Sequence, residues 1–504
     1  MADSSPAAPN TSSTPSAKPQ RDAVDKALAE APARSTGSLQ LAGRRMDYRV
    51  DAGFVPVLAD THGDSRGDPE AAIFTTAYQL EGAAAAERPV CFAFNGGPGS
   101  SSVFLHLGAL GPKRVRIPDD GTMPPPPYGL EDNPHSWLAH ADLVFIDPPH
   151  TGYSLTASDE ARKKMFSVDG DVNALCEVMR AWLTRHQRWG SPVYLCGESY
   201  GTTRACAMAD RLCNLGVALA GLILVSCAMD IQALEFSPRN DLPYGLYLPA
   251  FAGVAQYHGC LKGPQAASPE AAREAAAEFV LSDYLAALHQ GGRLAGKERS
   301  RVAKRIGELI GLPAALVEQH NLRISDMAFF AELLRERGLM LGRLDARVTA
   351  PRGLHRSREF EFDPGLEPLV GPYTMAAMAY FSGPLGLPAT RPYELMSEQA
   401  HKGWNWNRGE AQGNGYACTS PDLARVLRRL PHLKLFVASG HYDLGTPYSA
   451  TDWTLDQLDI PDAVRSRIVH RYYGAGHMMY TREADLVQLK TDLASWFPPQ
   501  ASAQ

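Results

Sequence analysis

Three residues of this chain have the types and the order that hydrolysis by a nucleophilic serine requires. Ser199 lies in the run Gly197-Glu198-Ser199-Tyr200-Gly201, after an apolar segment at 193–196 and before a helix-like segment at 202–215. A strand, a sharp turn and a helix form the context in which a Gly-x-Ser-x-Gly motif presents its serine as a nucleophile. The motif alone is a weak signal, and an ordinary loop serine between glycines is the alternative interpretation.

A serine hydroxyl needs a base within hydrogen-bond reach, and the base needs an acid that orients it. Asp443 and His477 each follow an apolar, strand-like run. We therefore predict Ser199, Asp443 and His477 as nucleophile, orienting acid and general base, in the chain order of the α/β-hydrolase arrangement. Asp452 and Asp456 are rivals for the acid, but both fall inside the following helical pattern. For His477 the alternative is a capping or packing role.

Acyl transfer also needs an oxyanion hole made of backbone amides beside the nucleophile. One candidate is the amide of Tyr200, the residue after Ser199. The other is the amide of Gly97, in the loop 95–99 (Asn-Gly-Gly-Pro-Gly) that follows an earlier apolar run. Hydrolases of this arrangement place their second donor on such a loop. The alternative is that 95–99 is only a tight turn.

The elements that must position these residues alternate along the chain. Apolar runs predict strands at 88–94, 141–147, 193–196, 219–226, 432–439 and 466–473, and helical periodicity predicts helices at 172–188, 202–215, 446–458 and 483–497. Two earlier runs, 46–57 and 71–80, are expected to form an antiparallel pair. This pattern indicates the α/β class: a mixed, mostly parallel sheet with helices on both faces.

The alternation stops between about 231 and 417. Helices are expected there at 269–288, 297–309, 313–319 and 325–337, with short strands at 343–349 and 360–362. We interpret residues 231–417 as an inserted, mainly helical cap that divides an α/β-hydrolase core into residues 39–230 and 418–500. Residues 1–38 are rich in Ala, Pro, Ser and Thr, so they are predicted to be a disordered tail.

The composition is that of a soluble globular protein, with 45% hydrophobic and 21% charged residues and a net charge of −6 over 504 residues. So mild a charge gives no reason to expect nucleic acid or a membrane as a partner, and no run is long enough to span a membrane. The start of the chain lacks the pattern of a secretory signal. We expect a cytoplasmic protein, with a periplasmic or secreted one as the alternative, and leave the oligomeric state open, a homodimer included.

The eight cysteines fit a reducing compartment. Six of them lie in apolar runs, and no C-x-x-C pair indicates zinc or redox chemistry. Cys260 and Cys418, in loop-like regions, could pair, but free thiols are the expectation. We expect neither a metal nor a cofactor.

The chain resembles the serine carboxypeptidase family of α/β-hydrolases, and is most similar to its bacterial branch. The resemblance covers about residues 45–230 and 415–497, and the cap matches weakly through 342–345. The matching motifs are Asn95-Gly96-Gly97-Pro98-Gly99-Ser100-Ser101-Ser102, Gly111-Pro112, Asn133-Pro134-His135-Ser136-Trp137, Asp147-Pro148, Gly152-Tyr153-Ser154, Gly197-Glu198-Ser199-Tyr200-Gly201, the Asp443 segment and Gly474-Ala475-Gly476-His477-Met478.

The resemblance implies further roles. Asn95 and Glu198, with the amide of Gly96, would hold the terminal carboxylate of a peptide, and Met478 would line the pocket of the leaving residue. Glu198 can accept a carboxylate only when one of the two groups is protonated. Ala109 stands where many members have a second Glu beside this one, so we expect a pH optimum nearer neutral than acidic.

The predicted function is therefore a serine-type carboxypeptidase acting on peptides with a free C-terminus through an acyl-enzyme on Ser199. The nearest alternative is an esterase or acyltransferase that uses the same triad on small-molecule esters, because a fold does not fix a substrate. A non-catalytic scaffold that binds partners through its cap is a second alternative. Residue preference and physiological substrate stay open.

Overall fold

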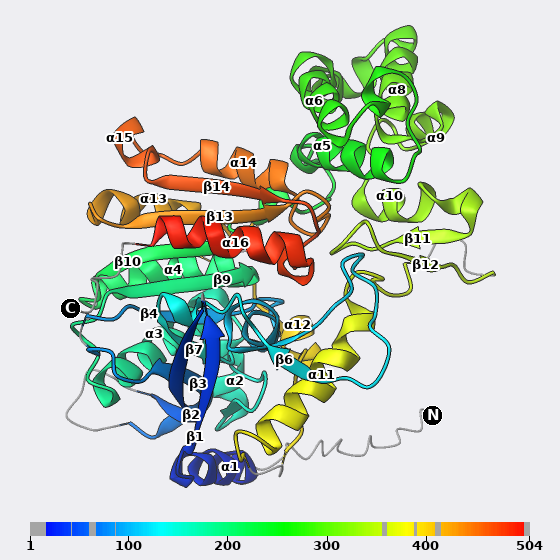
Figure 1. Ribbon diagram of the computed structural model, residues 1–504. Helices are drawn as coiled ribbons and strands as arrows, with labels where there is room; N and C mark the ends of the chain where they lie inside the picture. Colours follow the sequence, from blue (N-terminus) through cyan, green and yellow to red (C-terminus); the bar gives the residue numbers. More distant parts are fainter. Residues whose placement is uncertain are drawn as a thin grey trace, which may run out of the picture.

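A mixed ten-stranded sheet forms the centre of the computed structural model, which describes residues 17–41, 43–59, 67–85, 87–354, 360–387, 391–408 and 415–497 (Figure 1). In spatial order its strands are β1 (Ala33–Leu41), β2 (Arg44–Leu58), β3 (Pro69–Leu80), β7 (Asp142–Ile146), β4 (Val90–Phe94), β9 (Val193–Ser199), β10 (Leu219–Cys227), β13 (Lys434–Gly440) and β14 (Ile468–Tyr473), and β8 (Leu155–Thr156) pairs with β3. The strands from β7 to β14 run parallel, whereas β1, β2 and β3 pair antiparallel. The predicted α/β class is confirmed.

Helices cover both faces of this sheet because its parallel strands are apolar on both sides. One face packs against α2 (Asp159–Met165), α3 (Val168–Arg185), α4 (Tyr200–Asn214), α13 (Ser420–Arg429) and α14 (Tyr448–Asp456). The other packs against a π-helical turn (Leu105–Leu110), α11 (Glu367–Ser382) and α16 (Glu483–Trp496). Short elements complete this part of the chain: β5 (Lys113–Val115), β6 (Leu130–Asp132), α12 (Glu398–Gly403) and α15 (Asp462–Arg465).

The inserted segment builds a helical layer with a core of its own, beside the ends of β13 and β14 (Figure 1). It contains α5 (Leu242–Tyr257), α6 (Pro269–Phe279), α7 (Leu285–Gln290), α8 (Gly296–Ile310), α9 (Ala314–Gln319), α10 (Asp326–Glu332) and the antiparallel pair β11 (Leu339–Leu341) and β12 (Thr349–Pro351). Tyr442 and Leu444, from the loop after β13, are buried in the same core. The cap is thus packed directly onto the loop that carries Asp443.

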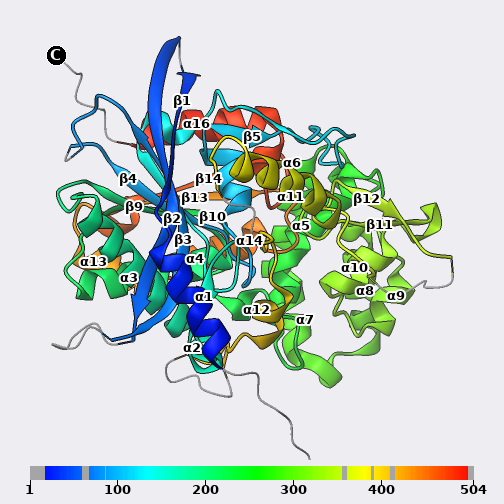
Figure 2. The ribbon, with the colours of Figure 1, turned by 90° about the horizontal axis from the view of Figure 1, so that it is seen from below.

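Two predictions about the elements are wrong. Residues 17–38, predicted to be disordered, form α1 (Ala17–Ala29) and most of β1, while residues 1–16 lie outside the described part of the chain. The helix α1 lies beside β3 (Figure 2). Its residues Val24 and Ala27 are buried against Ala72 of β3 and Ala157. The strands expected at 343–349 and 360–362 are also absent from the described residues, because the hairpin lies at β11 and β12, and residues 343–348 form the turn between them.

All eight cysteines are free thiols, so Cys260 and Cys418 are not paired. None of the described helices is both long enough and apolar enough to cross a membrane. Among the described residues no group of three or more His, Cys, Asp or Glu side chains is placed to hold a metal ion.

Candidate active site

Ser199 lies at the junction of β9 and α4, in a strained turn. Its φ of 60° and ψ of −130° fall in a region that residues with a Cβ rarely adopt. The turn requires glycine at both flanking positions. A Cβ at Gly197 would clash with the carbonyl of Gly201, and a Cβ at Gly201 would come too close to the carbonyl of Phe94. The chain therefore passes close to itself here, and the Ser199 side chain is half-buried where the rest of β9 is fully buried.

Asp443 and His477 meet across the ends of two adjacent strands. The loops after β13 and β14 bring Asp443 Oδ2 to 2.7 Å from His477 Nδ1. The other contacts of the carboxylate fix its orientation: it accepts hydrogen bonds from the amides of Gly445 and Thr446, at 2.8 and 2.9 Å, and from the Thr446 hydroxyl at 2.6 Å. Because Nδ1 is engaged by Asp443, Nε2 is the ring nitrogen left for proton transfer.

The electrostatics of this buried pair favour a charged imidazole. Burial is the largest single influence on the pKa of His477 and would lower it, but the charge and hydrogen bond of Asp443, together with the charge of Glu198, raise the pKa overall. Burial is likewise the largest influence on Asp443 and would raise its pKa, but the charge of His477 and the hydrogen bonds from His477 and Thr446 together lower it. Each partner therefore stabilises the ionised form of the other, as a general base that must hold a proton requires.

The two predicted oxyanion amides border the same space as Ser199. Gly97 and Tyr200 line one cavity with Ser199. Tyr200 is the first residue of α4, so its amide has no acceptor inside the helix. A Cβ at Gly96 would clash with the amide nitrogen of Tyr200, so only glycine lets the 95–99 loop approach the nucleophile turn this closely. The arrangement can stabilise an oxyanion beside Ser199.

A buried ion pair beneath the turn was not anticipated from the sequence. Arg204 of α4 donates to Asp171 of α3 and to the carbonyl of Asn95, both at 2.6 Å, and its guanidinium lies 5.1 Å from the centre of the Tyr200 ring. Arg204 and Asp171 are both fully buried. The pair ties the nucleophile helix to the loop that carries Gly97.

The cavity at Ser199 has a volume of about 710 Å³ and takes most of its wall from the cap. Charged side chains of both signs line it, those of Glu235, Asp326 and Arg343. Two tryptophans of the segment after α12 lie in different surroundings. Trp404 packs on Phe166 and Tyr200, whereas Trp406 also contacts Tyr200 but lines the cavity. Glu235 and Asp326 were missed because they come from segments with no motif. Arg343 lies in the weakly matching segment 342–345, to which the sequence assigned no role.

Glu198 and Asn95 lie together, yet deeper than the cavity. Glu198 is 2% exposed and Asn95 3% exposed, and neither is among the residues that line the described cavity. The Asn95 side chain contacts Glu198, while its Oδ1 accepts a hydrogen bond from the amide of Leu105. Met478 is buried in the apolar core and is likewise outside the cavity lining. Its expected role at the leaving-residue pocket therefore stays a prediction.

Tyr480 is a hydrogen-bond partner of the buried Glu198 carboxyl group. Its hydroxyl donates to Glu198 Oε2 at 2.8 Å, and its ring occupies the space that a side chain at Gly108 would need. Ala109, the next residue, is fully buried. Burial is the main cause that raises the pKa of Glu198, to about 7, although the charge of His477 and the hydrogen bonds of Tyr480 and Asn95 oppose it. Glu198 can therefore exchange a proton near neutral pH.

Comparisons with known proteins agree with this geometry over part of the chain. Residues 68–216 match the family model described as serine carboxypeptidase. Serine carboxypeptidase-like 3 of Arabidopsis thaliana is 27% identical over 172 residues, which cover 32% of this chain and 37% of the relative. The pheromone-processing carboxypeptidase kex1 of Sclerotinia sclerotiorum is 31% identical over 154 residues, covering 30% and 21%. The chain thus aligns with well under half the length of either relative.

The fold likeness extends over most of the chain. A crystal structure of Kex1 from Saccharomyces cerevisiae, described as a prohormone-processing carboxypeptidase, superposes with a TM-score of 0.55 at 15% identity and covers 89% of this chain and 91% of that one. This supports the α/β-hydrolase fold with its inserted cap. The relatives named here are from plants and fungi, so they give no support to the bacterial branch suggested by the motifs.

Proposed function

We propose that this chain, which is similar to the serine carboxypeptidases over residues 68–216, removes C-terminal residues from peptides through an acyl-enzyme on Ser199. Three features support the proposal: the strained turn at Ser199, the buried Asp443–His477 pair and the two candidate oxyanion amides. Ser199 and the residues that carry these amides, Gly97 and Tyr200, line one cavity. Thr446, which hydrogen-bonds both Asp443 and His477, lines that cavity too.

The proposed reaction assigns one step to each of these groups. Ser199 Oγ attacks the scissile carbonyl and gives its proton to His477 Nε2, while Asp443 stabilises the imidazolium. The amides of Gly97 and Tyr200 hold the oxyanion. His477 then protonates the leaving amine, which departs as the C-terminal residue. Water, deprotonated by the same imidazole, hydrolyses the acyl-enzyme and restores Ser199.

Selection of the terminal carboxylate is assigned to Glu198, Asn95 and the amide of Gly96. A protonated Glu198 can donate a hydrogen bond to a carboxylate, whereas an ionised one repels it. The raised pKa of Glu198, about 7, supports this role, because the group can hold a proton at neutral pH. A peptide must reach past the described cavity to meet it, which makes Glu198 the least accessible part of the proposed site.

Replacement of Ser199 by Ala tests the nucleophile. We expect Ser199→Ala to abolish hydrolysis of blocked dipeptides and labelling by a fluorophosphonate, because no acyl-enzyme or phosphonyl-enzyme can form. The matched control is Ser282→Ala, an exposed serine of the cap, which should behave as the unmodified protein. Persistence of either signal in Ser199→Ala would show that another residue is the nucleophile.

The burial of Glu198 and its absence from the cavity lining favour one rival: an esterase or acyltransferase that uses the same triad. Hydrolysis of a blocked dipeptide, of its C-terminal amide and of a simple aryl ester discriminates between the two. A carboxypeptidase prefers the free acid, whereas the rival acts on the ester without regard to a terminal carboxylate. The cytoplasmic location, the absence of nucleic-acid and membrane partners and the bacterial branch remain predictions.

A further inference from the structure

One segment of the cap passes between the two loops that carry the acid and the base of the triad. Residues 343–346, here called the cap strap, contact both loops through backbone hydrogen bonds. The carbonyl of Arg343 accepts from the amide of Leu444 at 3.0 Å, and the carbonyl of Leu344 accepts from the amide of His477 itself at 2.6 Å. The strap therefore touches the residue after Asp443 and the backbone of His477.

Contact between the strap and the His477 loop is backbone against backbone. A Cβ at Gly476, the residue before His477, would clash with the carbonyl of Leu344 and lie 2.6 Å from the Cα of Asp345. A third hydrogen bond, from the amide of Ala346 to the carbonyl of Tyr442 at 2.9 Å, closes the strap onto the Asp443 loop. Since no flexible side chain lies between them, a shift of the strap is passed on to both loops.

The carboxylate of Asp363 holds the strap from behind. Its Oδ1 accepts from the amides of Arg343 and Gly365, both at 2.8 Å, and its Oδ2 accepts from the amide of Leu344 at 3.1 Å. Asp363 is 8% exposed, so these backbone amides replace most of its water. Asp363 thus binds the amides of Arg343 and Leu344, and these are the same two residues whose carbonyls accept hydrogen bonds from the triad loops.

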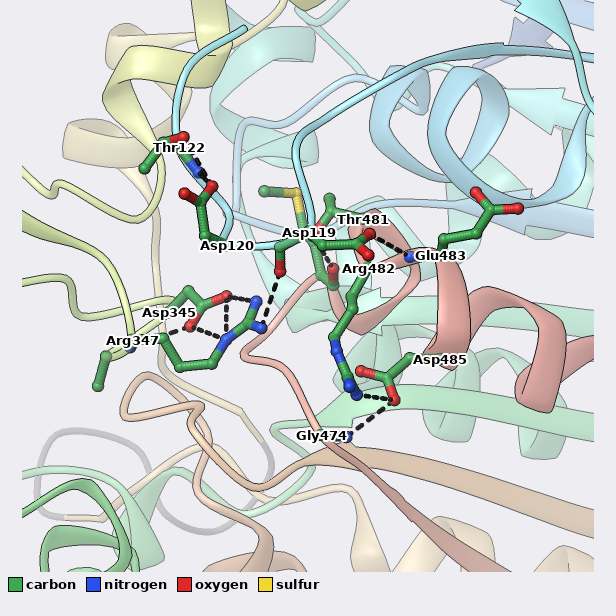
Figure 3. Close-up of polar contacts among 12 residues, drawn as sticks. Asp119, Asp120, Thr122, Asp345, Arg347, Gly474, Thr481, Arg482, Glu483 and Asp485 are labelled. Carbon is green, nitrogen blue, oxygen red and sulfur yellow. Dashed lines mark hydrogen bonds and ion pairs between the residues drawn. The ribbon is translucent and has the colours of Figure 1, made fainter. Parts of the chain in front are cut away.

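A second anchor fixes the far end of the strap to the start of α16 (Figure 3). Asp345 forms a buried ion pair with Arg347 at 2.6 Å, and Arg347 also donates to the carbonyl of Asp119 at 3.0 Å. The Asp119 carboxylate accepts from the amide of Glu483 at 2.9 Å. The strap is thus attached to the Asp443 loop, which precedes the His477 loop in the sequence, and through Arg347 and Asp119 to the start of α16, which follows it.

We propose that Asp363 is a positioning residue of the catalytic centre: by holding the cap strap it fixes the separation and orientation of Asp443 and His477. It touches neither substrate nor the reacting atoms. The cap accordingly helps to build the triad and does more than cover the cavity. The proposal rests on the proposed function only in taking Ser199, Asp443 and His477 as the reactive centre, whatever the substrate.

Asp363→Asn tests this role. The substitution turns one carboxylate oxygen into an NH2 group, which cannot accept a hydrogen bond, so at least one of the backbone N–H groups around it loses its acceptor. A misplacement of catalytic groups by about 1 Å can cost about 100-fold in rate. We expect kcat and the rate of fluorophosphonate labelling to fall together by about 10- to 100-fold, with KM changed less than about threefold. The acidic limb of the pH–rate profile should also move to lower pH. A loosened contact with Asp443 raises the pKa of His477 less, and this effect is larger than the opposing one of the Arg343 charge, which lowers that pKa.

The control is Asp142→Asn. This carboxylate is also buried, but it lies at the amino end of β7, away from the loops of the triad, where it binds Arg88 and Arg188. Its melting temperature should fall while kcat per fluorophosphonate-titrated site stays within twofold of the unmodified protein. Should Asp363→Asn fail to fold, Asp363→Glu keeps both carboxylate oxygens as acceptors, displaced by one methylene group, and should give a smaller loss of the same kind.

A folded Asp363 variant whose kcat and labelling rate stay within twofold of the unmodified protein overturns the proposal. Labelling makes the test independent of the substrate. If the protein is labelled at Ser199 but cleaves no C-terminal peptide bond, the proposed function fails, and the labelling rates of the variants still decide the role of Asp363.

Discussion

Under the proposed function, Glu198 is the residue that would distinguish a carboxypeptidase from a general hydrolase. Its pKa of about 7 means that it is protonated below neutral pH and ionised above it. For a substrate with a terminal carboxylate, kcat/KM should therefore fall above about pH 7, as the ionised Glu198 repels the substrate. The same enzyme acting on an amide or ester should show no such fall, because those substrates carry no terminal charge.

Glu198→Gln provides the check, since the amide cannot ionise and can still accept the hydrogen bond from Tyr480. We expect the fall above pH 7 to disappear for free-acid peptides. The acidic limb should remain, because it reports protonation of His477, whose pKa is raised. These two limbs predict an optimum near neutral pH, and a profile that peaks below about pH 5 would contradict it. An alkaline limb that survives in the variant would remove Glu198 from carboxylate selection.

The sequence identified the residues of this site whose types follow a local motif, and missed those that act through long-range contacts. Ser199, Asp443 and His477 each follow an apolar strand, so their common edge of the sheet was predictable, and the structure brings Asp443 and His477 together. Tyr480 and Asp363 belong to no motif. Their hydrogen-bond partners lie 282 and about 20 residues away in the chain, and no local sequence pattern predicts such a pair.

At the scale of elements, continuous apolar strands and amphipathic helices were predictable because burial imposes their patterns. The helix α5 was missed since Pro243 and Pro249 interrupt a stretch that is apolar on all sides, which leaves no helical periodicity. The segment 17–38 failed for the opposite reason. It is polar and poor in large apolar residues. Even so, Val24, Ala27 and the partly buried Leu28 dock α1, with hydrogen bonds from two polar residues of the helix, and β1 pairs along the edge of the sheet.

Docking of α1 can be tested with two neighbouring substitutions. Val24 is fully buried, whereas Ala23, the residue before it, is exposed. Val24→Asp places an unpaired charge in an apolar contact and should destabilise docking by about 2–3 kcal/mol. Ala23→Asp should have little effect. We expect tryptic cleavage at Lys26, within α1, to accelerate at least tenfold in Val24→Asp alone. Equal cleavage rates in both variants would restore the prediction of a disordered segment.

For the whole molecule, the site is placed where three parts of the chain converge. β9 supplies Ser199, β13 and β14 carry the loops of Asp443 and His477, and the cap adds both the cavity wall and the strap. In the sequence, Ser199 precedes the insertion, whereas Asp443 and His477 follow it. Neither half of the core therefore contains all three residues of the proposed triad. Because several parts of the chain meet here, they cover carboxylates such as Glu198 and Asp363 and bury them.

The unfolding free energy should depend on pH through Glu198. Its pKa is raised from 4.5 to about 7 on folding, so the folded protein holds this proton over a pH range in which the unfolded chain has lost it. The stability contributed by the neutral group is complete below about pH 4.5 and is lost as pH rises to about 7. A shift of this size corresponds to about 3 kcal/mol, at about 1.4 kcal/mol for each pH unit.

Glu198→Gln removes this contribution, and the other titrating groups are common to both proteins. His477 still responds to the substitution, because the charge of Glu198 is one of the causes that raise its pKa, so its smaller change is part of the measured difference. We expect the variant to gain about 3 kcal/mol of unfolding free energy relative to the unmodified protein between pH 4.5 and pH 8, measured by urea denaturation at each pH. A difference that stays constant over this range would mean that Glu198 is ionised at its usual pKa in the folded protein. The assigned role of Glu198 as a proton donor to a peptide carboxylate at neutral pH would then fail with it, since an ionised carboxylate cannot donate.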